Sequence, residues 1–250
     1  MDLSEFFRGH PKVAVAFSGG TDSAYLLYEA ERQAKSVRAY YVKSAFQPQF
    51  ELDDAVRLSV ELNVPLTVIN VDVLSAADVV SNTVKRCYFC KRRIFTAIKE
   101  HAMQDGFNVL LDGTNASDDV SDRPGMAALK ELSVLSPLRL CGLTKADVRR
   151  LSKEAGLFTW DKPAYACLAT RIPTGQQITA QLLERTEMAE NCLSALGLHD
   201  FRVRSFDDYA KIQVRAADML LLLEHRAHIL EKLGKEYKGV LLDLEARDGQ

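Results

Sequence analysis

Near the start of the chain stands the stretch Val13-Ala14-Val15-Ala16-Phe17-Ser18-Gly19-Gly20-Thr21-Asp22-Ser23. Its apolar first half predicts a buried strand, and the apolar residues that follow at three-to-four spacing predict a helix. The two glycines allow a tight turn in which backbone N–H groups can point at a phosphate. The N-terminus of the predicted helix adds partial positive charge. The stretch therefore predicts a phosphate-binding loop, although a plain capped turn between strand and helix would use the same residues.

The side chains of this loop suit a nucleotide whose pyrophosphate departs. Ser18, Thr21 and Ser23 offer hydroxyl donors, and Asp22 lies among them. No lysine follows the glycines, so the loop differs from the Gly-Lys-Ser/Thr loop of hydrolytic nucleotidases. That difference favours cleavage of ATP to AMP and pyrophosphate, with Asp22 as a candidate catalytic residue. The predicted ATP-binding residues of the loop are Ser18, Gly19, Gly20, Thr21, Asp22 and Ser23.

Strand-like and helix-like segments alternate over the first two-thirds of the chain. This alternation predicts an α/β fold with a parallel sheet that helices cover on both faces. Ligands of such sheets bind at the carboxyl ends of the strands. We therefore expect the phosphate loop, residues 112–115 with Thr114 and Asn115, and the loop before Cys87 to converge. Beyond residues 13–17, strands are predicted at 37–42, 66–71 and 109–111, and helices at 51–62, 90–103 and 144–155.

The order of the predicted elements changes after residue 173. A long helix is followed by two strands around a tight turn, then by a helix and a last strand, which indicates a small α+β domain. We therefore expect an ATP-binding and adenylylation domain over residues 1–173 and a substrate-binding or oligomerisation domain over 174–250. The elements of the second domain are predicted at 179–196, 201–206, 210–214, 218–233 and 239–244.

Composition excludes several classes of protein. Apolar residues make up 47% of the chain and charged residues 26%, which excludes disordered, collagen-like and coiled-coil chains. A formal charge of −2 argues against a broad nucleic-acid surface. The acidic start and the lack of an apolar run of about 18 residues predict neither a secretory leader nor a membrane span. Five cysteines, an odd number, favour the reducing cytoplasm.

Three of the cysteines form a candidate metal site. Cys87 and Cys90 make a Cys-x-x-Cys pair, and Cys167 lies further along the chain. Soft thiolates suit an iron–sulfur cluster or zinc. Three ligands on a four-iron cluster would leave one iron open to carry a sulfide. From spacing alone the pair could equally be a zinc half-site or a redox pair, and Cys167 could be a small buried residue.

Basic side chains near these cysteines are candidates for binding an anionic nucleotide. Lys91 follows the cysteine pair, and Arg171 lies about one helical turn from Cys167. Arg202 and Arg204 alternate along a predicted strand, so their side chains share one face. Paired guanidiniums suit a phosphate or carboxylates. The alternative for each of these side chains is a solvated surface charge.

Seven further motifs follow the phosphate loop in order along the chain. They are RCYFCK at 86–91, LDGTN at 111–115, DRPG at 122–125, SPL at 136–138, GLTK at 142–145, WDKP at 160–163 and ACLATRIP at 166–173. The phosphate loop is similar to the signature of the PP-loop ATP pyrophosphatases, and the whole series resembles the LarE family. That family comprises ATP-dependent sulfur transferases that build the nickel-pincer nucleotide cofactor of lactate racemase. The resemblance covers nearly the whole chain, and the segment around Cys167 is its most specific part.

The resemblance implies a specific reaction. ATP and Mg²⁺ would adenylylate a carboxylate of pyridinium-3,5-biscarboxylic acid mononucleotide, and sulfur would then displace AMP to leave a thiocarboxylate. In one version of the family, a cysteine at the position of Cys167 donates its own sulfur and becomes dehydroalanine. In the other, three cysteines hold a [4Fe-4S] cluster that carries the sulfide, and the presence of Cys87 and Cys90 favours this version. The resemblance also implies a homo-oligomer such as a hexamer.

The resemblance assigns roles in the C-terminal domain as well. It places Arg202 and Arg204 at the substrate and makes Glu190 a candidate site or metal carboxylate. Glu187 and Glu190 share a helix face, so a solvated acidic face is the alternative for both. The chain departs from the family at Gln213, where a glutamate is expected, and a neutral amide binds cations more weakly than a carboxylate.

Three other functions compete with this interpretation. A cluster-dependent tRNA 2-thiolation enzyme also combines a PP-loop with three cysteines, but the near-neutral charge counts against it. A nucleotide-binding sensor on a similar sheet would bind ATP without any chemistry. An amide-forming synthetase of the same superfamily would leave Cys87, Cys90 and Cys167 without a role.

Overall fold

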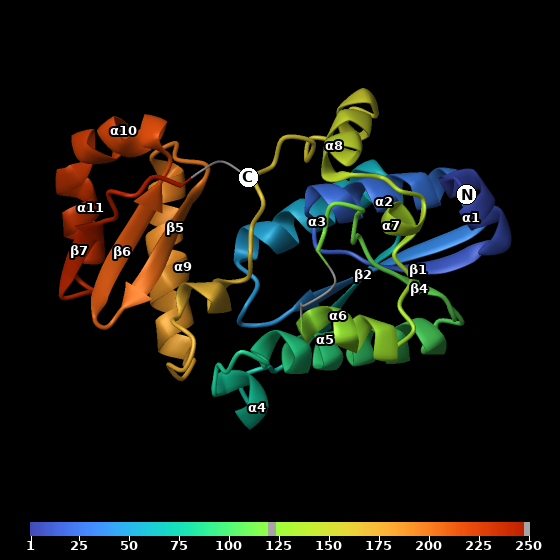
Figure 1. Ribbon diagram of the computed structural model, residues 1–250, viewed down its shortest axis with the longest axis horizontal. Coiled ribbons are helices and arrows are strands. Elements are labelled where there is room, and N and C mark those ends of the chain that lie inside the picture. Colours follow the sequence, from blue (N-terminus) through green and yellow to red (C-terminus); the bar gives the residue numbers. More distant parts are fainter. Residues whose placement is uncertain (120–123, 248–250) are drawn as a thin grey trace. The chain divides into compact units, whose positions relative to one another are not determined.

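The protein, described by a computed structural model over residues 1–119 and 124–247, forms two compact units (Figure 1). The first unit comprises Met1–Val73 and Lys85–Lys162. The second comprises Leu74–Val84 and Pro163–Gln250. The chain therefore passes into the second unit twice, and its final crossing lies at residues 162 and 163, whereas the sequence analysis expected a single division after residue 173.

Two sets of contacts attach additional segments to the C-terminal unit. Arg171 forms an ion pair with Glu190 at 2.7 Å, which fastens residues 163–173 to this unit. The side-chain amide of Asn82 donates hydrogen bonds to the carbonyl oxygens of Pro173 and Gln176 at 2.8 and 3.0 Å. These contacts explain why 74–84 and 163–173 pack with the C-terminal sheet.

A four-stranded parallel sheet forms the centre of the first unit. Its strand order is β3-β2-β1-β4, and every neighbouring pair runs parallel. This arrangement confirms the predicted α/β fold, in which the carboxyl ends of all strands lie along one edge. The strands are β1 (Lys12–Ala16), β2 (Ser36–Lys43), β3 (Leu66–Asn70) and β4 (Leu110–Leu111).

Helices cover both faces of this sheet, as Figure 1 shows. Successive side chains of a strand point to opposite faces, so β1 contributes to two separate cores. Val13 and Val15 pack with the side of the sheet that α2 covers, whereas Ala14 packs with Ile98 of α5 on the other. The helices are α1 (Leu3–Gly9), α2 (Thr21–Gln33), α3 (Gln49–Glu61), α5 (Arg86–Gln104), α6 (Pro124–Glu131), α7 (Pro137–Leu140) and α8 (Lys145–Glu154).

The second unit is built on a three-stranded sheet of order β5-β6-β7. β5 and β6 are antiparallel around the predicted turn, where Asp207 has a φ of 51°, and β7 runs parallel to β6. Leu193 of α9 and Leu233 of α11 pack against Val203 and Ile212 of the sheet. The elements are α4 (Ala77–Val80), η1 (Leu168–Arg171), α9 (Ala180–Ala195), β5 (Phe201–Phe206), β6 (Tyr209–Val214), η2 (Ala216–Asp218), α10 (Met219–Glu224), α11 (Arg226–Leu233) and β7 (Gly239–Leu242).

Helix ends follow the capping residues where the sequence contains them. The Thr144 side chain accepts a hydrogen bond from the backbone of Asp147 in a capping box, and Gly156 just beyond α8 has a φ of 72°. The Thr179 side chain accepts from Leu182 N and begins α9. Both predicted starts are therefore confirmed.

Several helical predictions differ from the structure. α5 begins at Arg86 and not at residue 90, so Cys87 and Cys90 both lie within its first five residues. α1, α4, α6 and α7 were not expected. The helix expected over 218–233 is broken at His225, although Leu222 and Ile229 keep a spacing that one continuous helix would also satisfy. Within the described residues, none of the helices combines the length and apolar content needed to cross a membrane.

The loops after β1 and β4 touch through a glycine. A Cβ atom placed on Gly113 would lie 2.8 Å from the backbone nitrogen of Ser23 and 3.1 Å from its Cα. Both atoms belong to the backbone of α2 and cannot rotate away. A residue without a side chain is therefore required at 113 for the two loops to meet.

We predict that Gly113→Ala lowers the free energy of unfolding by about 1–3 kcal/mol, because the added methyl group must push the two loops apart. Gly9→Ala is the matched control, since a Cβ at Gly9 meets no atom within 4 Å. Urea unfolding of both variants measures the difference. Equal stability of the two variants would contradict the close contact between the loops.

Candidate functional site

The loop between β1 and α2 has the backbone that phosphate binding requires. Gly19 has a φ of 73°, and a Cβ there would lie 2.9 Å from the carbonyl oxygen of Glu51. Gly20 is the N-cap residue of α2 and offers no side-chain cap. The first N–H groups of this 13-residue helix are therefore left for another acceptor, at the end that carries partial positive charge.

The hydroxyl groups of Ser18 and Thr21 differ in exposure and in hydrogen-bond partners. Ser18 is exposed, and its Oγ lies 3.1 Å from Ser23 Oγ. Thr21 is buried, and its Oγ1 donates a 2.8 Å hydrogen bond to the carbonyl of Thr159. Ser18 is thus placed to meet a phosphate, whereas the Thr21 hydroxyl fastens the loop to the segment before residue 162.

Asp22 is the meeting point of three elements. Its carboxylate pairs with Lys145 Nζ at 2.5 Å and accepts from Asn115 Nδ2 at 3.2 Å. Lys145 begins α8, and Asn115 belongs to the loop after β4. The expected convergence of Asp22 and Asn115 at the carboxyl edge of the sheet is therefore present. The role of Lys145 was missed, although it belongs to the GLTK motif.

Thr114 supports this edge from within. Its Oγ1 donates to Asp112 Oδ2 at 2.5 Å, and Ser136 Oγ donates to the other oxygen of Asp112 at 2.5 Å. Asp112 is buried, so both oxygens of this carboxylate are satisfied inside the protein. Thr114 therefore holds the loop after β4 in place through Asp112.

A second lysine lies against the phosphate loop. Lys162 Nζ donates to the carbonyl of Gly19 at 3.2 Å and pairs with Asp54 at 2.6 Å. Its side chain is half-buried. Lys145 and Lys162 thus bring two ammonium groups to the loop, each held by an aspartate, where the charge of a triphosphate would need them. Lys162 was also missed as a site residue, although it belongs to the WDKP motif.

The cysteine pair lies at the start of α5 in the first unit. Positions three apart on a helix share one face, so Cys87 and Cys90 are neighbours. Cys87 is exposed and Cys90 is buried. Arg86 donates from Nη2 to Cys87 Sγ at 3.7 Å. Lys91 follows on the helix, with its stem so close to Gly125 of α6 that a Cβ there would meet Lys91 Cδ at 2.8 Å.

The third candidate thiol belongs to the other unit. Cys167 is half-buried and directly precedes η1. Over residues 1–119 and 124–247, no group of three or more His, Cys, Asp and Glu side chains is placed to hold a metal ion. The donor set suits iron, since all three side chains are soft thiols, and two of them are neighbours. Asp122 and Arg123 of the DRPG motif lie outside the described residues.

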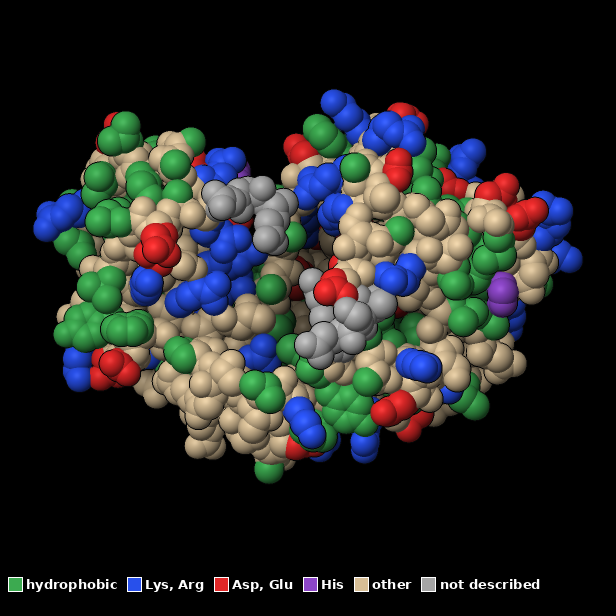
Figure 2. Space-filling model, in the orientation of Figure 1, with side chains coloured by type: hydrophobic (Ala, Val, Ile, Leu, Met, Phe, Trp, Pro, Cys, Tyr) green, Lys and Arg blue, Asp and Glu red, His purple; other side chains and the backbone are tan. Residues whose placement is uncertain are grey.

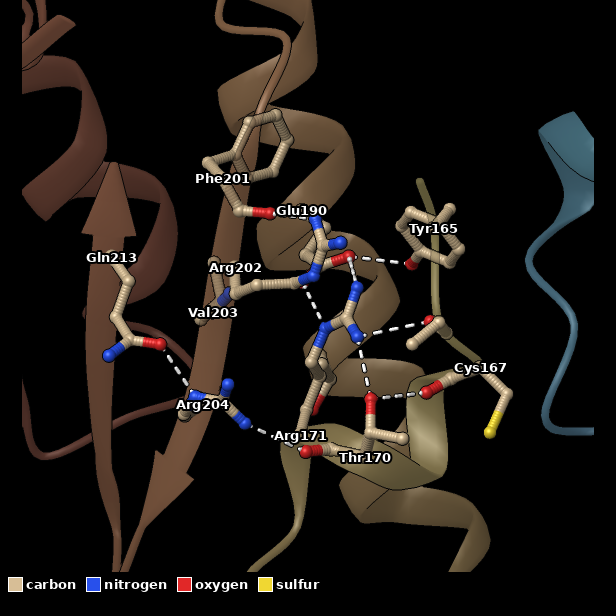
Figure 3. A network of polar contacts seen from close by, with 12 residues as sticks. Tyr165, Cys167, Thr170, Arg171, Glu190, Phe201, Arg202, Val203, Arg204 and Gln213 are labelled. Carbon is tan, nitrogen blue, oxygen red and sulfur yellow. Dashed lines mark hydrogen bonds and ion pairs between the residues drawn. The ribbon is translucent and has the colours of Figure 1, made fainter. Parts of the chain in front are cut away.

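Arg171 and Glu190 form an ion pair next to the Cys167 segment in the second unit (Figure 3). Arg171 and Glu190 are joined by two contacts, Nε to Oε1 at 2.7 Å and Nη2 to Oε2 at 3.2 Å. Their side chains are only 1% and 6% exposed. Tyr165 also donates to Glu190 Oε2 at 2.6 Å. Neither member of the pair is a solvated surface charge.

Arg202 and Arg204 reach the same segment from β5. Arg202 Nη2 donates to the carbonyl of Ala164 at 2.5 Å, and Arg204 Nη1 donates to that of Thr170 at 3.0 Å. Burial, and after it the positive charge of Arg171, lowers the pKa of Arg202 to about 10. Arg202 is therefore still cationic at neutral pH, in a setting that an added anion would stabilise.

Gln213 is the side-chain partner of Arg204 and does not neutralise its positive charge. Its Oε1 accepts from Arg204 Nε at 2.6 Å, and its Nε2 donates to Asp243 at 2.7 Å. Because the amide is neutral, it orients Arg204 without cancelling the charge, which a glutamate at this position would do. The departure from the family at Gln213 thus leaves Arg204 as a cation with an amide partner.

The chain is similar to several known proteins, three of which cover the range of similarity. A protein of Lactiplantibacillus plantarum named pyridinium-3,5-bisthiocarboxylic acid mononucleotide synthase is 32% identical over 93% of this chain and 86% of its own. The uncharacterized protein slr1717 of Synechocystis is 34% identical over 85% and 80%. The tRNA-specific 2-thiouridylase MnmA of a Thermotoga species is 24% identical over 58% and 52%. The family model of the queuosine biosynthesis protein QueC matches residues 12–111.

We predict that Thr21→Val lowers the free energy of unfolding by about 1–3 kcal/mol, because the carbonyl of Thr159 loses the Thr21 hydroxyl and keeps only the backbone N–H of Lys162 as donor. The variant should also lose most of the rise in melting temperature that ATP produces, since the loop is no longer fastened. Thr186→Val is the control: Thr186 is as deeply buried, and its hydroxyl bonds only within α9, to Leu182. Thermal unfolding with and without ATP measures both effects. An unchanged ATP response in Thr21→Val would contradict the fastening role.

Proposed function

The chain belongs to the LarE family of PP-loop ATP-dependent sulfur transferases, and we propose that it converts a carboxylate of pyridinium-3,5-biscarboxylic acid mononucleotide to a thiocarboxylate. The relative named for the bisthiocarboxylic product aligns with 93% of the chain, which supports this substrate. The observation that carries the proposal is the phosphate loop, where Asp22 meets Lys145 and Asn115 at the carboxyl edge of the sheet.

The first unit supplies the groups for adenylylation. PP-loop enzymes use ATP with Mg²⁺, and the backbone N–H groups at the start of α2 suit the pyrophosphate. Mg²⁺ prefers oxygen ligands, and Asp22 offers a partly exposed carboxylate that fits it. When bound, the ion would neutralise charge on the phosphates. We assign Lys145 and Lys162 to the same anion, because both ammonium groups lie beside the loop.

The reaction then balances in two steps. A carboxylate oxygen of the substrate attacks the α-phosphorus of ATP, pyrophosphate leaves, and an acyl adenylate forms. A sulfur nucleophile then attacks the acyl carbon, the bond to the carboxyl oxygen breaks, and AMP leaves with that oxygen. Hydrogen bonds from the loop to pyrophosphate would favour the first step, because stabilising the leaving group lowers the activation barrier of adenylylation.

We place the anionic part of the substrate at Arg202 and Arg204. Both guanidiniums come from β5, and burial lowers the pKa of each, which favours the arrival of a negative charge. Arg204 has a neutral partner in Gln213, so its charge is not cancelled. We assign Lys91 to the nucleotide as well, because it is half-buried at the end of the cysteine pair.

We propose that the sulfur comes from a [4Fe-4S] cluster held by Cys87, Cys90 and Cys167. The support is chemical: two thiols are neighbours in the first turn of α5, and the third precedes η1 in the segment most similar to the family. A cluster with three thiolate ligands would supply a sulfide nucleophile. The alternative source is the thiol of Cys167 itself.

A tRNA 2-thiolation activity is the second candidate, because the chain is similar to tRNA-specific 2-thiouridylases over 58% of its length. The formal charge of −2 counts against RNA binding. Filter binding of tRNA separates the two functions. Tight, salt-sensitive binding would favour the tRNA substrate over the pyridinium nucleotide.

We further propose that the protein works in the reducing cytoplasm as a homo-oligomer. Its five cysteines are all thiols, which suits that compartment. The C-terminal unit exposes hydrophobic side chains around α10, α11 and β7, which Figure 2 shows in green. Such patches mark protein interfaces. The exposed leucines are Leu220, Leu223, Leu230, Leu241 and Leu244.

The two steps should separate by mutation. We predict that Asp22→Ala slows pyrophosphate release by about 100-fold, because a charge positioned for the transition state is lost. Cys167→Ser should release pyrophosphate at the wild-type rate but form no thiocarboxylate. Pyrophosphate assay and mass spectrometry of the product measure the steps.

The controls for this pair are Asp53→Ala and Cys192→Ser, which change an exposed aspartate and a cysteine outside the site. Both should behave as wild type. Loss of pyrophosphate release in Cys167→Ser would refute the division of the reaction between the two steps.

The sulfur source is open to a direct measurement. We predict that protein purified without oxygen contains about four iron and at least four sulfide atoms per chain. Cys87→Ser and Cys90→Ser should lose the iron and keep pyrophosphate release. A colourless, iron-free wild type whose Cys167 becomes dehydroalanine on turnover would show that Cys167 is consumed instead.

A further inference from the structure

We propose that the buried ion pair of Arg171 and Glu190 is a positioning device that sets the place of the Cys167 thiol relative to β5. This inference rests on the proposed function, in which Cys167 serves sulfur transfer. It assigns both residues to the support of the thiol, whereas the sequence analysis expected Arg171 to bind an anionic nucleotide and Glu190 to be a site or metal carboxylate.

The guanidinium of Arg171 is fully engaged by the protein. Nε and Nη2 contact the carboxylate of Glu190 at 2.7 and 3.2 Å. Nη1 donates to the carbonyl of Ala166 at 3.0 Å and to Thr170 Oγ1 at 2.7 Å. With 1% of its side chain exposed, Arg171 is surrounded by protein. The guanidinium therefore links the Glu190 carboxylate on α9 to residues before and after Cys167 in the chain.

Thr170 carries this constraint to the cysteine. Its hydroxyl donates to the carbonyl of Cys167 at 2.8 Å, and its backbone N–H donates to the same oxygen at 2.9 Å. The Cys167 carbonyl is thereby held by two donors of one residue. Since Arg171 donates to Thr170 Oγ1, the hydroxyl proton is directed at Cys167, as the dashed lines of Figure 3 show. The backbone on which the thiol stands is fixed by this chain of bonds.

Glu190 joins the same chain to the strand that carries the substrate arginines. Its Oε1 accepts from the backbone N–H of Val203 at 3.0 Å, in addition to Arg171. Val203 lies between Arg202 and Arg204 on β5. The Glu190 carboxylate thus fixes the position of the thiol segment relative to the two arginines. A nucleophile and its substrate require such a fixed relative position to react.

The carbonyls of the cysteine segment are held by three arginines. Arg202 binds Ala164, Arg171 binds Ala166, and Arg204 binds Thr170. Apart from the single turn of η1, this segment has no regular structure to fix it. A buried ion pair adds little net stability over an apolar pair of similar size. The Arg171 guanidinium makes four hydrogen bonds, to Glu190, Ala166 and Thr170. We therefore infer that the ion pair contributes by placing the cysteine segment.

The test separates placement from stability. Arg171→Met leaves Glu190 buried and unpaired, so it should unfold most easily. Arg171→Met with Glu190→Gln removes both charges while the amide oxygen can still accept from Val203 N–H. We expect the double variant to regain stability in urea unfolding yet to form thiocarboxylate at least about tenfold more slowly than wild type.

A second readout does not depend on activity. In the metal-free full chain, iodoacetamide labelling of Cys167, resolved by peptide mass spectrometry, should change in rate in the double variant and partly return in Arg171→Lys. Arg185→Met is the matched control, because Arg185 also donates to a backbone carbonyl of this unit, that of Asp207, away from Cys167. It should leave Cys167 labelling and thiocarboxylate formation unchanged.

The outcomes distinguish the two proposals. If stability and thiocarboxylate formation recover together in the double variant, or if Cys167 labelling is unchanged, the positioning role is overturned. If the wild type itself forms no thiocarboxylate, the proposed function fails, and the labelling rates still decide whether the ion pair places the thiol.

Discussion

The parallel pairing of β1 with β4 is the constraint on which the first unit depends. It brings the loops after these strands so close that Gly113 has no room for a side chain beside Ser23. At this contact Asp22 reaches both Asn115 and Lys145. Negative phosphate groups can be held only where donors and cations already converge, because such groups are costly to reorganise after binding. The sheet register therefore creates the proposed nucleotide site.

Ion pairs fix the positions of charged side chains in both units. In the first unit, Asp22 pairs with Lys145 and Asp54 with Lys162. In the second, Glu190 pairs with Arg171, away from water. The partly exposed pairs can exchange partners when an anion arrives, whereas the buried pair is fixed by desolvation. In the proposed function, activation of the carboxylate and placement of the thiol thus make different demands, and each unit is assigned one of them.

The sequence predicted the elements whose signals are local and left out those that depend on tertiary contacts. Apolar runs and the caps Thr144 and Thr179 gave the strands and two helix starts. The start of α5 was missed because the apolar spacing that predicted this helix begins only at Ile94, and the break at His225 because the apolar spacing continues across it. Asp22 was found from the loop motif. Its partner Lys145 lies 123 positions away, so only the fold could reveal the pair.

In the proposed reaction the substrate's carboxyl oxygen leaves on AMP when sulfur takes its place. Pyridinium-3,5-biscarboxylic acid mononucleotide labelled with ¹⁸O in its carboxylates, followed by mass spectrometry of the nucleotide products after turnover with ATP, measures this transfer. AMP should carry one labelled oxygen for each thiocarboxylate formed. Unlabelled AMP, or ADP as the product, would refute the reaction.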